Sequence, residues 1–461
     1  MNLPPIFENV ISNDLCIGCG VCAAVCPVSC LRMEFNDSGR YLPRELEGCT
    51  RCGLCLKTCP FADNNINEDE LARDLYGQNS DIRYNTDIGY FRSCHVGYSL
   101  EGEQRAKGAS GGMATWFLSK LLSEGIVDRV ACVAPESGTS LFRYTICNTA
   151  EQIGLSAKSA YYPVEISEAL TTMAKQGGRY AVICLPCVAK AIRLASSSIP
   201  ALRDNLVCVA GLVCGHGVNA FFAEYVAAIA DEKAGQPLAI TFRVKSHDHP
   251  SYDHGTTCIW KSGSGTISKT VRWSEGPDDA WSGHWFDPNP CLFCDDNFAE
   301  LADIVFMDAW LPEYVNDYRG TNLVMARSEL AEKIIEKGLT AGVISLPQCS
   351  PEDIVRSQSG ALRHKQEGLA HRLWEELKSG RHVPKKRISP AREPNLFIRC
   401  EYHRHLWAAR KGSTYWKNRN SLAEFQARMA LVGHPCFRDR CSRKFASISR
   451  RLARKMKRRV V

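Results

Sequence analysis

The sequence lacks any run of 18 apolar residues, and its first residues, MNLPPIFENVISND, contain neither a basic stretch nor an apolar segment. The first absence argues against a membrane-spanning helix, which needs about 20 mainly apolar residues. The second argues against a secretory signal peptide. We therefore expect a cytoplasmic protein in a reducing setting, where disulfides are rare.

Acidic residues are scarce beyond residue 380. Residues 381–461 carry 23 Lys and Arg against four Asp and Glu, so the net charge of +7 combines a basic segment of +19 with a remainder of −12. We interpret 381–461 as a basic, partly helical C-terminal extension, and we expect a helix over 421–430. Solvated charge is the commoner explanation for such a segment.

The end of this extension, SISRRLARKMKRRVV, suggests an alternative. On a helix, Ile448, Leu452 and Met456 would share one side among basic residues. That pattern suits an anionic membrane surface, so peripheral attachment to the inner membrane face is a second hypothesis. We do not expect a nucleic-acid partner. The aromatic residues Trp407 and Trp416 more simply dock the extension on the core.

Cysteine, by contrast, is abundant, with 23 residues, which argues for metal and redox chemistry. Eight cysteines form two runs of the spacing Cys-x2-Cys-x2-Cys-x3-Cys-Pro. They are Cys16, Cys19, Cys22 and Cys26, and then Cys49, Cys52, Cys55 and Cys59. This spacing is typical of two [4Fe–4S] clusters, in which the fourth cysteine of each run binds the other cluster. Disulfides and paired zinc sites need no such repeat. We predict an α+β ferredoxin-like module over residues 1–65.

A polar segment, 66–93, follows and is typical of a solvated, weakly ordered linker. From 94 to 380, short β-branched runs alternate with helical patterns, which predicts an α/β domain with a partly parallel sheet. The predicted strands are Arg129–Ala134, Tyr180–Cys184, Leu206–Val213, Asp303–Met307 and Asn322–Met325. The predicted helices are Gly111–Glu124, Val188–Ala195, Ala220–Ala230 and Glu329–Lys337.

Three further patterns in this domain carry chemistry. KGASGGMAT, from Lys107 to Thr115, precedes a helix and indicates either an anion site or, more commonly, a glycine-rich helix cap. Asp308 ends a predicted strand, where it would face a ligand or cap a turn. Four more cysteines follow or flank strand ends: Cys187, Cys214, Cys291 and Cys294. Together they could form a third metal site, whereas the Cys291–Cys294 pair alone could be a redox pair or half a zinc site.

Taken in order, the cysteine runs, KGASGGMAT, AKSAYYP, ICLPCVAKAI, GLVCGHG and CLFCDDNFAELADIVFMDAW resemble the coenzyme F420 hydrogenase/dehydrogenase beta-subunit family over about residues 15–337. The resemblance implies an α/β domain that binds FAD and a third [4Fe–4S] cluster behind the ferredoxin module. It implies that Cys187, Cys214, Cys291 and Cys294 hold that cluster. The flavin neighbourhood would then comprise Lys107, Ser110, Gly111, Gly112, Thr115, Lys158 and Asp308.

The expected function is an iron–sulfur flavoprotein oxidoreductase that links one-electron clusters to a two-electron substrate, a deazaflavin coenzyme or another small molecule. Lys158 and His216 are candidate charge or proton donors. A ferredoxin or other redox protein would be the electron partner. The alternative is an electron-transfer subunit without a substrate site of its own, which feeds a partner enzyme. Four residues just before Cys291 are expected as cleft walls, and the aromatic ones among them equally as core: Trp281, His284, Trp285 and Phe286.

Overall fold

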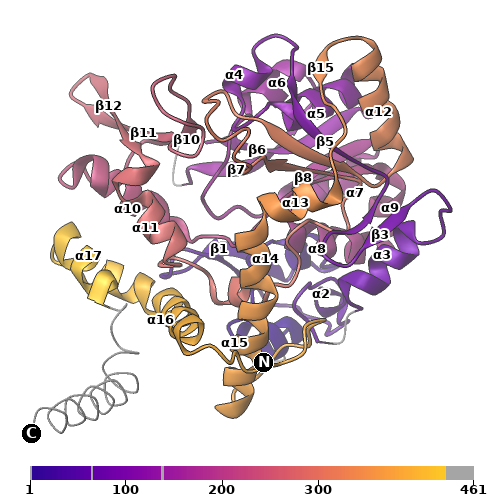
Figure 1. The fold of residues 1–461 in the computed structure, drawn as a ribbon. Helices are drawn as coiled ribbons and strands as arrows, with labels where there is room; N and C mark the ends of the chain where they lie inside the picture. The colour runs from indigo at the N-terminus through magenta and orange to yellow at the C-terminus, as the bar shows by residue number, and fades with distance from the viewer. Residues whose placement is uncertain (1–2, 64–65, 137–139, 432–461) are drawn as a thin grey trace, which may run out of the picture.

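The computed structural model describes residues 3–63, 66–136 and 140–431 (Figure 1). Its first unit holds both cysteine runs. The elements of this unit are η1 (Phe7–Ile11), α1 (Val21–Ala24), β1 (Leu31–Phe35), β2 (Tyr41–Glu45) and α2 (Leu54–Lys57), with β1 and β2 antiparallel. The one-turn helices α1 and α2 begin directly after Gly20 (φ 82°) and Gly53 (φ 77°). A side chain would be strained in this left-handed conformation, so glycine allows the chain to turn sharply beside the cysteines.

This N-terminal unit packs directly on the α/β domain. The backbone N–H of Ile166 donates to the Cys19 carbonyl at 2.9 Å, and the N–H of Ala220 donates to the Gly39 carbonyl at 2.9 Å. A Cβ at Gly20 would lie 2.1 Å from Glu165 Oε2. The Glu165 carboxylate could move aside, so the backbone conformation of Gly20 is the stronger reason for a glycine here.

Residues 66–93 differ from the expected linker. They form α3 (Glu68–Tyr76) and a hairpin of β3 (Arg83–Asn85) and β4 (Gly89–Phe91). Asn67 accepts from the N–H of Glu70, and the Glu70 side chain accepts from the N–H of Asn67, which completes a capping box. Leu71, Ala72 and Tyr76 are buried against the domain. The prediction of weak order was wrong because polar residues here cap a helix whose other face is apolar.

The domain is built on an eight-stranded sheet in the order β15-β5-β14-β13-β9-β8-β6-β7. Strands β6, β8, β9 and β13 are parallel, and the outer pairings are antiparallel. The strands are β5 (Ser93–Ser99), β6 (Arg129–Pro135), β7 (Phe142–Cys147), β8 (Tyr180–Cys184), β9 (Leu206–Leu212), β13 (Ile304–Asp308), β14 (Asn322–Ala326) and β15 (Ile344–Ser345). The predicted partly parallel sheet is thereby confirmed.

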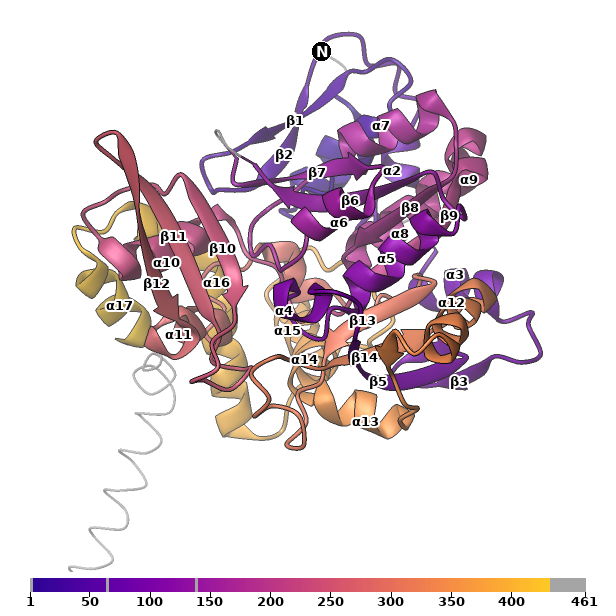
Figure 2. The ribbon, with the colours of Figure 1, turned by 90° about the horizontal axis from the view of Figure 1, so that it is seen from above.

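Helices cover both faces of this sheet (Figure 2). One face carries α5 (Met113–Ser123), α6 (Ala150–Leu155) and α12 (Glu329–Thr340). The other carries α7 (Ser167–Gln176), α8 (Pro186–Ser198), α9 (Pro200–Asn205) and α1 of the N-terminal unit. All four predicted helices are present, within a few residues of their predicted ends, because each presents a continuous apolar face.

A second sheet of three antiparallel strands lies beside the first: β10 (Ala239–Val244), β11 (Gly255–Ser262) and β12 (Gly265–Arg272). Its core is shared with α10 (Ala220–Asp231), α16 (Leu396–Lys417) and α17 (Leu422–Leu431), as Figure 2 shows. The remaining elements are α4 (Gln104–Lys107), η2 (Trp273–Glu275), α11 (Pro277–Ser282), η3 (Asn289–Phe293), α13 (Pro351–Ser357), α14 (Ser359–Lys365) and α15 (Glu367–Lys378). Phe286 and Trp285 are buried in this core, so they are not cleft walls.

The first part of the basic extension is integrated into the fold. Helix α17 confirms the expected helix, and Trp416 of α16 is 1% exposed. Arg387 pairs with Glu300 at 2.8 Å, and Lys386 pairs with Asp295 at 3.3 Å. Ion pairs of Lys386 and Arg387 therefore join the start of the extension to acidic residues of the core. The segment proposed for membrane contact lies outside the described residues.

Within residues 3–431, apart from the gaps given above, no helix is long and apolar enough to cross a membrane.

Replacing Trp416 by alanine is expected to destabilise the protein by about 3–5 kcal/mol, because it leaves a cavity in the shared core. The indole also donates to Glu224 Oε2 at 2.9 Å. Chemical denaturation followed by circular dichroism measures the change. Phe397→Ala on the same helix is the control, since Phe397 is 68% exposed and its loss should change the free energy of unfolding by less than about 0.5 kcal/mol. Equal effects would show that α16 is not anchored on the core.

Candidate functional site

The first cysteine set comprises Cys16, Cys19, Cys22 and Cys59, the crossed grouping expected from the spacing. Burial raises the pKa of the Cys22 thiol well above its usual value, and the nearby thiols of Cys19 and Cys16 raise it further. Burial also raises the pKa of Cys59, and Cys19 and Cys16 again add to the effect. Backbone N–H groups donate to three of these sulfurs, which partly offsets the rise in pKa. Thiolates gathered here need adjacent positive charge, which cluster iron supplies. The donor set fits a [4Fe–4S] cluster.

The second set comprises Cys26, Cys49, Cys52 and Cys55. These cysteines line one small, partly open pocket, together with Pro4, Pro5 and Leu31 among others. Cys52 is exposed, so this pocket lies at the surface. Cys30 also lines it, with its Sγ 3.4 Å from that of Cys26. Burial raises the pKa of Cys30 to about 12, and Cys26 and Cys49 add to the effect. Sequence reasoning missed Cys30 because it falls outside the repeated spacing.

The third set comprises Cys187 at the start of α8, Cys214 just after β9, and Cys291 and Cys294 on and after η3. Burial raises the pKa of the Cys187 thiol well above its usual value, and the thiols of Cys294 and Cys214 raise it further. The N–H of Gly217 donates to Cys291 Sγ at 3.3 Å. The fold therefore brings together four cysteines from a stretch of more than 100 residues of sequence.

Lys365 of α14 lies against this third set. Its side chain donates to Cys294 Sγ at 3.1 Å, although the residue is only 1% exposed. Burial lowers the pKa of this lysine, but the Cys294 and Cys214 thiols outweigh it and hold the pKa above its usual value. A buried ammonium beside thiols favours their charged form. No sequence motif marks Lys365, so it could not be predicted.

The three sets are neighbours. The Cys55 thiol of the second set raises the pKa of Cys22 in the first, and the Cys19 thiol of the first set raises that of Cys187 in the third; burial is the larger cause in both. Cysteines of all three sets also contact one apolar cluster. The first set therefore lies between the other two.

The glycine-rich turn is packed against the chain itself. A Cβ at Gly111 would lie 2.6 Å from the Gly97 carbonyl oxygen, and one at Gly112 would lie 2.5 Å from that of Gln104. Ser110 Oγ donates to the Thr321 carbonyl at 2.8 Å. Lys107 is exposed and pairs with Glu103 at 2.6 Å, and Thr115 is half-buried. The turn therefore acts at least as a helix cap, and Lys107 is held by a surface ion pair.

Cations converge beside this turn, at the carboxyl end of β13. Arg243 donates to Asp308 Oδ1 at 2.6 Å and to the Ala109 carbonyl at 3.1 Å. Lys158 donates to the Arg243 carbonyl at 3.1 Å, and Lys245 donates to that of Ser110 at 2.6 Å. Arg105 also lies here and pairs with Asp317 at 3.0 Å. The site therefore contains four cationic side chains and two carboxylates, those of Asp308 and Asp317. We call Arg105, Lys158, Arg243 and Lys245 the cation cluster.

Two observations mark the cation cluster as unusual. Lys158 (φ 94°) and Arg243 (φ 59°) both adopt positive φ, which is costly for residues with side chains and concentrates at functional sites. Burial lowers the pKa of Lys245 to about 7, and the charges of Lys158 and Arg243 lower it further. The surplus of positive charge suits an anionic ligand. Sequence reasoning found Lys158 and Asp308 but missed Arg243 and Lys245, which lie on and just after β10 without a motif.

His216 lies between the third set and the cation cluster. Its Nδ1 is 2.9 Å from Asp287 Oδ1, and its ring centroid is 4.4 Å from that of Trp281. The ring centroid of Trp281 is in turn 4.8 Å from that of Tyr161. Burial raises the pKa of Tyr161, and the nearby charge of Arg243 partly offsets this. An aromatic path thus joins the loop of Cys214 to the cation cluster.

The sequence matches two parts of one known protein family and a cluster-binding domain. The family described as coenzyme F420 hydrogenase/dehydrogenase, beta subunit, matches with its N-terminal part over residues 94–171 and with its C-terminal part over residues 177–352. A 4Fe-4S dicluster domain matches residues 15–62. A subunit of the F(420)H(2) dehydrogenase of Methanosarcina mazei is 22% identical over 346 residues, which cover 72% of this chain and 85% of that protein.

A solved structure of the F420-reducing [NiFe] hydrogenase complex from Methanosarcina barkeri aligns with a TM-score of 0.48 and 17% identity, over 64% of this chain and 96% of that one. The family matches together span more than half of the sequence. The chain therefore belongs to the coenzyme F420 hydrogenase/dehydrogenase beta-subunit family and carries a 4Fe-4S dicluster domain before the family region.

Proposed function

We propose that this member of the family is an iron–sulfur flavoprotein oxidoreductase with three [4Fe–4S] clusters and one FAD. The observation that carries the proposal is the order of the three cysteine sets. The second set opens to the surface at Cys52, the first lies in the middle, and the third sits at the carboxyl edge of the parallel strands. Open α/β sheets bind ligands at this edge.

The cation cluster supports the proposal that FAD binds at this site. Its positive surplus matches the two negative charges of a pyrophosphate, and Asp308 holds Arg243 in place. A bound flavin would exchange single electrons with the clusters and electron pairs with an organic substrate. In this proposal Lys158, Arg243 and Lys245 bind the phosphates. Ser110, Gly111, Gly112 and Thr115 shape the turn beside them.

Two residues are proposed to assist catalysis. Lys158 would supply positive charge next to the bound cofactor, because its ammonium is held in the cation cluster. His216 would exchange a proton with the substrate, and its ring lies beside the Asp287 carboxylate, whose Oδ1 is 2.9 Å from Nδ1.

The substrate and the partner follow from a relative by analogy. The similar protein of Methanosarcina mazei is named as one subunit of an F(420)H(2) dehydrogenase. We therefore propose a protein electron partner that docks near Cys52, and a deazaflavin or another small molecule as the two-electron substrate. Because one fold can host many chemistries, the substrate class rests on family membership and not on the fold.

Anaerobic reconstitution with iron, sulfide and FAD tests this function. The proposal requires about twelve irons per chain, from three four-iron clusters, and about one FAD. Reduction of the flavin by a one-electron donor should follow. A chain with about eight irons and no flavin would overturn the proposal in favour of an electron-transfer subunit that feeds a partner enzyme.

FAD affinity is expected to fall as the pH rises above 7. Lys245 has a pKa of about 7, so it is charged below that pH and loses its proton above it. Bound phosphates would favour the charged form, so binding takes up a proton and affinity should fall by about tenfold per pH unit between roughly pH 7.5 and 9. Titration of flavin-depleted protein measures this. Lys245→Arg should flatten the dependence, and an unchanged slope in that variant would contradict the assignment.

A further inference from the structure

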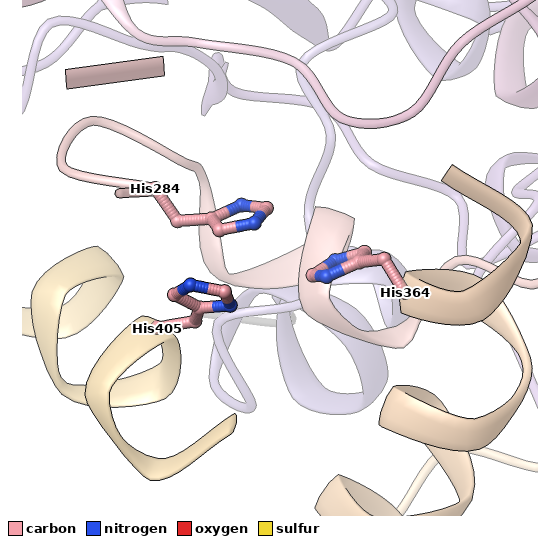
Figure 3. Close-up of side chains that lie close together, drawn as sticks. All are labelled: His284, His364 and His405. Atoms are coloured by element: carbon pink, nitrogen blue, oxygen red, sulfur yellow. The ribbon is translucent and has the colours of Figure 1, made fainter. Parts of the chain in front are cut away.

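We propose that His284, His364 and His405 form a binding site for a single Zn²⁺ ion, next to the third cysteine set and distinct from it. Each of the three histidines offers one ring nitrogen, and these nitrogens lie within 4.8 Å of one another. Figure 3 shows the three rings converging from three separate segments. The segments are the loop between α11 and η3, helix α14, and helix α16 of the C-terminal extension.

The rings are tightly grouped and buried. The centroids of the His284 and His364 rings are 4.4 Å apart, with an interplanar angle of 13°. Because the lone pair of an imidazole nitrogen lies in the ring plane, one of these two rings must turn for both to bind the same ion. The centroid of His405 is also 4.4 Å from that of His284. The three residues are 6–9% exposed. Single buried histidines occur elsewhere in this fold, such as His95, but here three imidazoles are packed together away from water.

Two ring nitrogens have no partner within the described part of the chain. They are His364 Nε2 and His405 Nδ1, and both atoms are buried. A buried polar atom without a hydrogen bond costs about 1–3 kcal/mol, so two of them in one cluster need an explanation. A metal ion bound by both nitrogens would satisfy them.

Asp287 positions His284, the third proposed ligand. Its Oδ2 lies 2.7 Å from His284 Nδ1, so that nitrogen carries the hydrogen and Nε2 is left as the ligand atom. A carboxylate behind a ligating histidine is the usual arrangement at zinc sites, where it fixes the ring and strengthens the ligand. Asp287 is itself buried and supplies one negative charge near the proposed ion.

The electrostatics suit a cation bound by neutral rings. All three rings are buried, and burial favours the neutral imidazole over its charged form. Zinc requires neutral imidazole. Arg372 opposes a cation, but its guanidinium donates to the carbonyls of Leu292 and His364. Three nitrogen ligands favour Zn²⁺ over Mg²⁺ and Ca²⁺, which prefer oxygen, and leave a fourth position for water.

Such an ion would connect the C-terminal extension to the third cysteine set. His405 lies on α16, His364 directly precedes Lys365, and His284 lies seven residues before Cys291. The bound ion would join α14, α16 and the loop that leads to Cys291. This role does not depend on FAD or on the third cluster.

Zinc content and zinc coordination test the proposal. The full chain, reconstituted anaerobically with iron and sulfide, would be incubated with one equivalent of Zn²⁺ and desalted. We expect about one zinc per chain, with a zinc K-edge spectrum of nitrogen or oxygen neighbours at about 2.0–2.1 Å and no sulfur. His364→Gln and His405→Gln should reduce zinc to less than about one tenth per chain, with iron unchanged.

Two controls separate this site from others. His95→Gln changes a buried histidine that bonds the Leu346 carbonyl at 3.1 Å elsewhere in the fold, so zinc should remain. His371→Gln alters a second group, His371, Glu375 and His403, and zinc should again remain. Zinc lost with His371→Gln but kept with His364→Gln would overturn the proposal.

The remaining outcomes also decide. Should the glutamine variants fail to fold, as judged by iron content and circular dichroism, His364→Cys provides a ligand of another kind. That variant should keep zinc and show one sulfur neighbour at about 2.3 Å. Failure of the wild-type chain to retain zinc, or a sulfur shell in the wild-type spectrum, would overturn the proposal, because the second result places zinc in the cysteine sets.

Discussion

Replacement of Cys187 by serine is expected to lower the iron content from about twelve to about eight per chain, because a cubane held by three cysteines is lost on isolation. Cys187 belongs to the third set, and its thiol is close enough to Cys19 of the first set to feel its charge. Loss of the third cluster should therefore also prevent electron transfer from the dicluster domain to the flavin. Flavin reduction by a one-electron donor should fall to the rate seen without the donor, while FAD stays bound.

Cys184→Ser is the matched control for this experiment. Cys184 ends β8 three residues earlier and is 2% exposed, yet it lies in none of the three sets. This variant should keep about twelve irons, although a buried hydroxyl could lower its stability by about 1–3 kcal/mol. Iron analysis and anaerobic stopped-flow reduction measure both variants. A Cys187→Ser chain that retains twelve irons would show that the third set is not a cluster site.

The parallel strands and the helices that cover them were predictable because their signal is local. β8 and β9 are continuous β-branched or apolar runs, which is typical of strands buried on both faces. β5 (SCHVGYS) lacks such a run, although six of its seven residues are buried. Its place depends on pairing with β14 and β15, and a Cβ at Gly97 would lie 1.8 Å from the Ser345 carbonyl oxygen. Tertiary contacts of this kind leave no periodic pattern in a sequence.

The same distinction applies to the sites. The eight cysteines of the two runs were recognisable from spacing alone, whereas Cys187 and Cys294 become neighbours only when β8, β9 and η3 are assembled. Arg243 and Lys365 were not predicted at all. In a sequence, a buried cation looks the same as a surface cation. Only the contacts of Arg243 with Asp308 and of Lys365 with Cys294 distinguish these two. His405 was hidden for a further reason: the basic composition of 381–461 suggested a solvated segment.

Replacement of Arg243 by methionine is expected to weaken FAD binding by about 2–4 kcal/mol, or roughly 30-fold to 1,000-fold in Kd. Arg243 is 3% exposed and its guanidinium neutralises Asp308, so its removal leaves a carboxylate beside the proposed phosphate site. Fluorescence titration of flavin-depleted protein with FAD measures the change. Arg179→Met is the control, because that arginine forms a half-exposed pair with Asp128 and should alter Kd by less than about twofold.

A double variant distinguishes two explanations for that loss. If Arg243 acted only by neutralising Asp308, then Arg243→Met combined with Asp308→Asn should restore FAD affinity fully, because the unpaired carboxylate is gone. If Arg243 also binds a phosphate of FAD, the double variant should recover only the repulsive part, about 1–3 kcal/mol, and remain weaker than the wild type. Full recovery would remove Arg243 from the flavin site and leave Lys158 and Lys245 as its cations. Unchanged affinity in Arg243→Met itself would contradict the assignment of the cation cluster to the flavin.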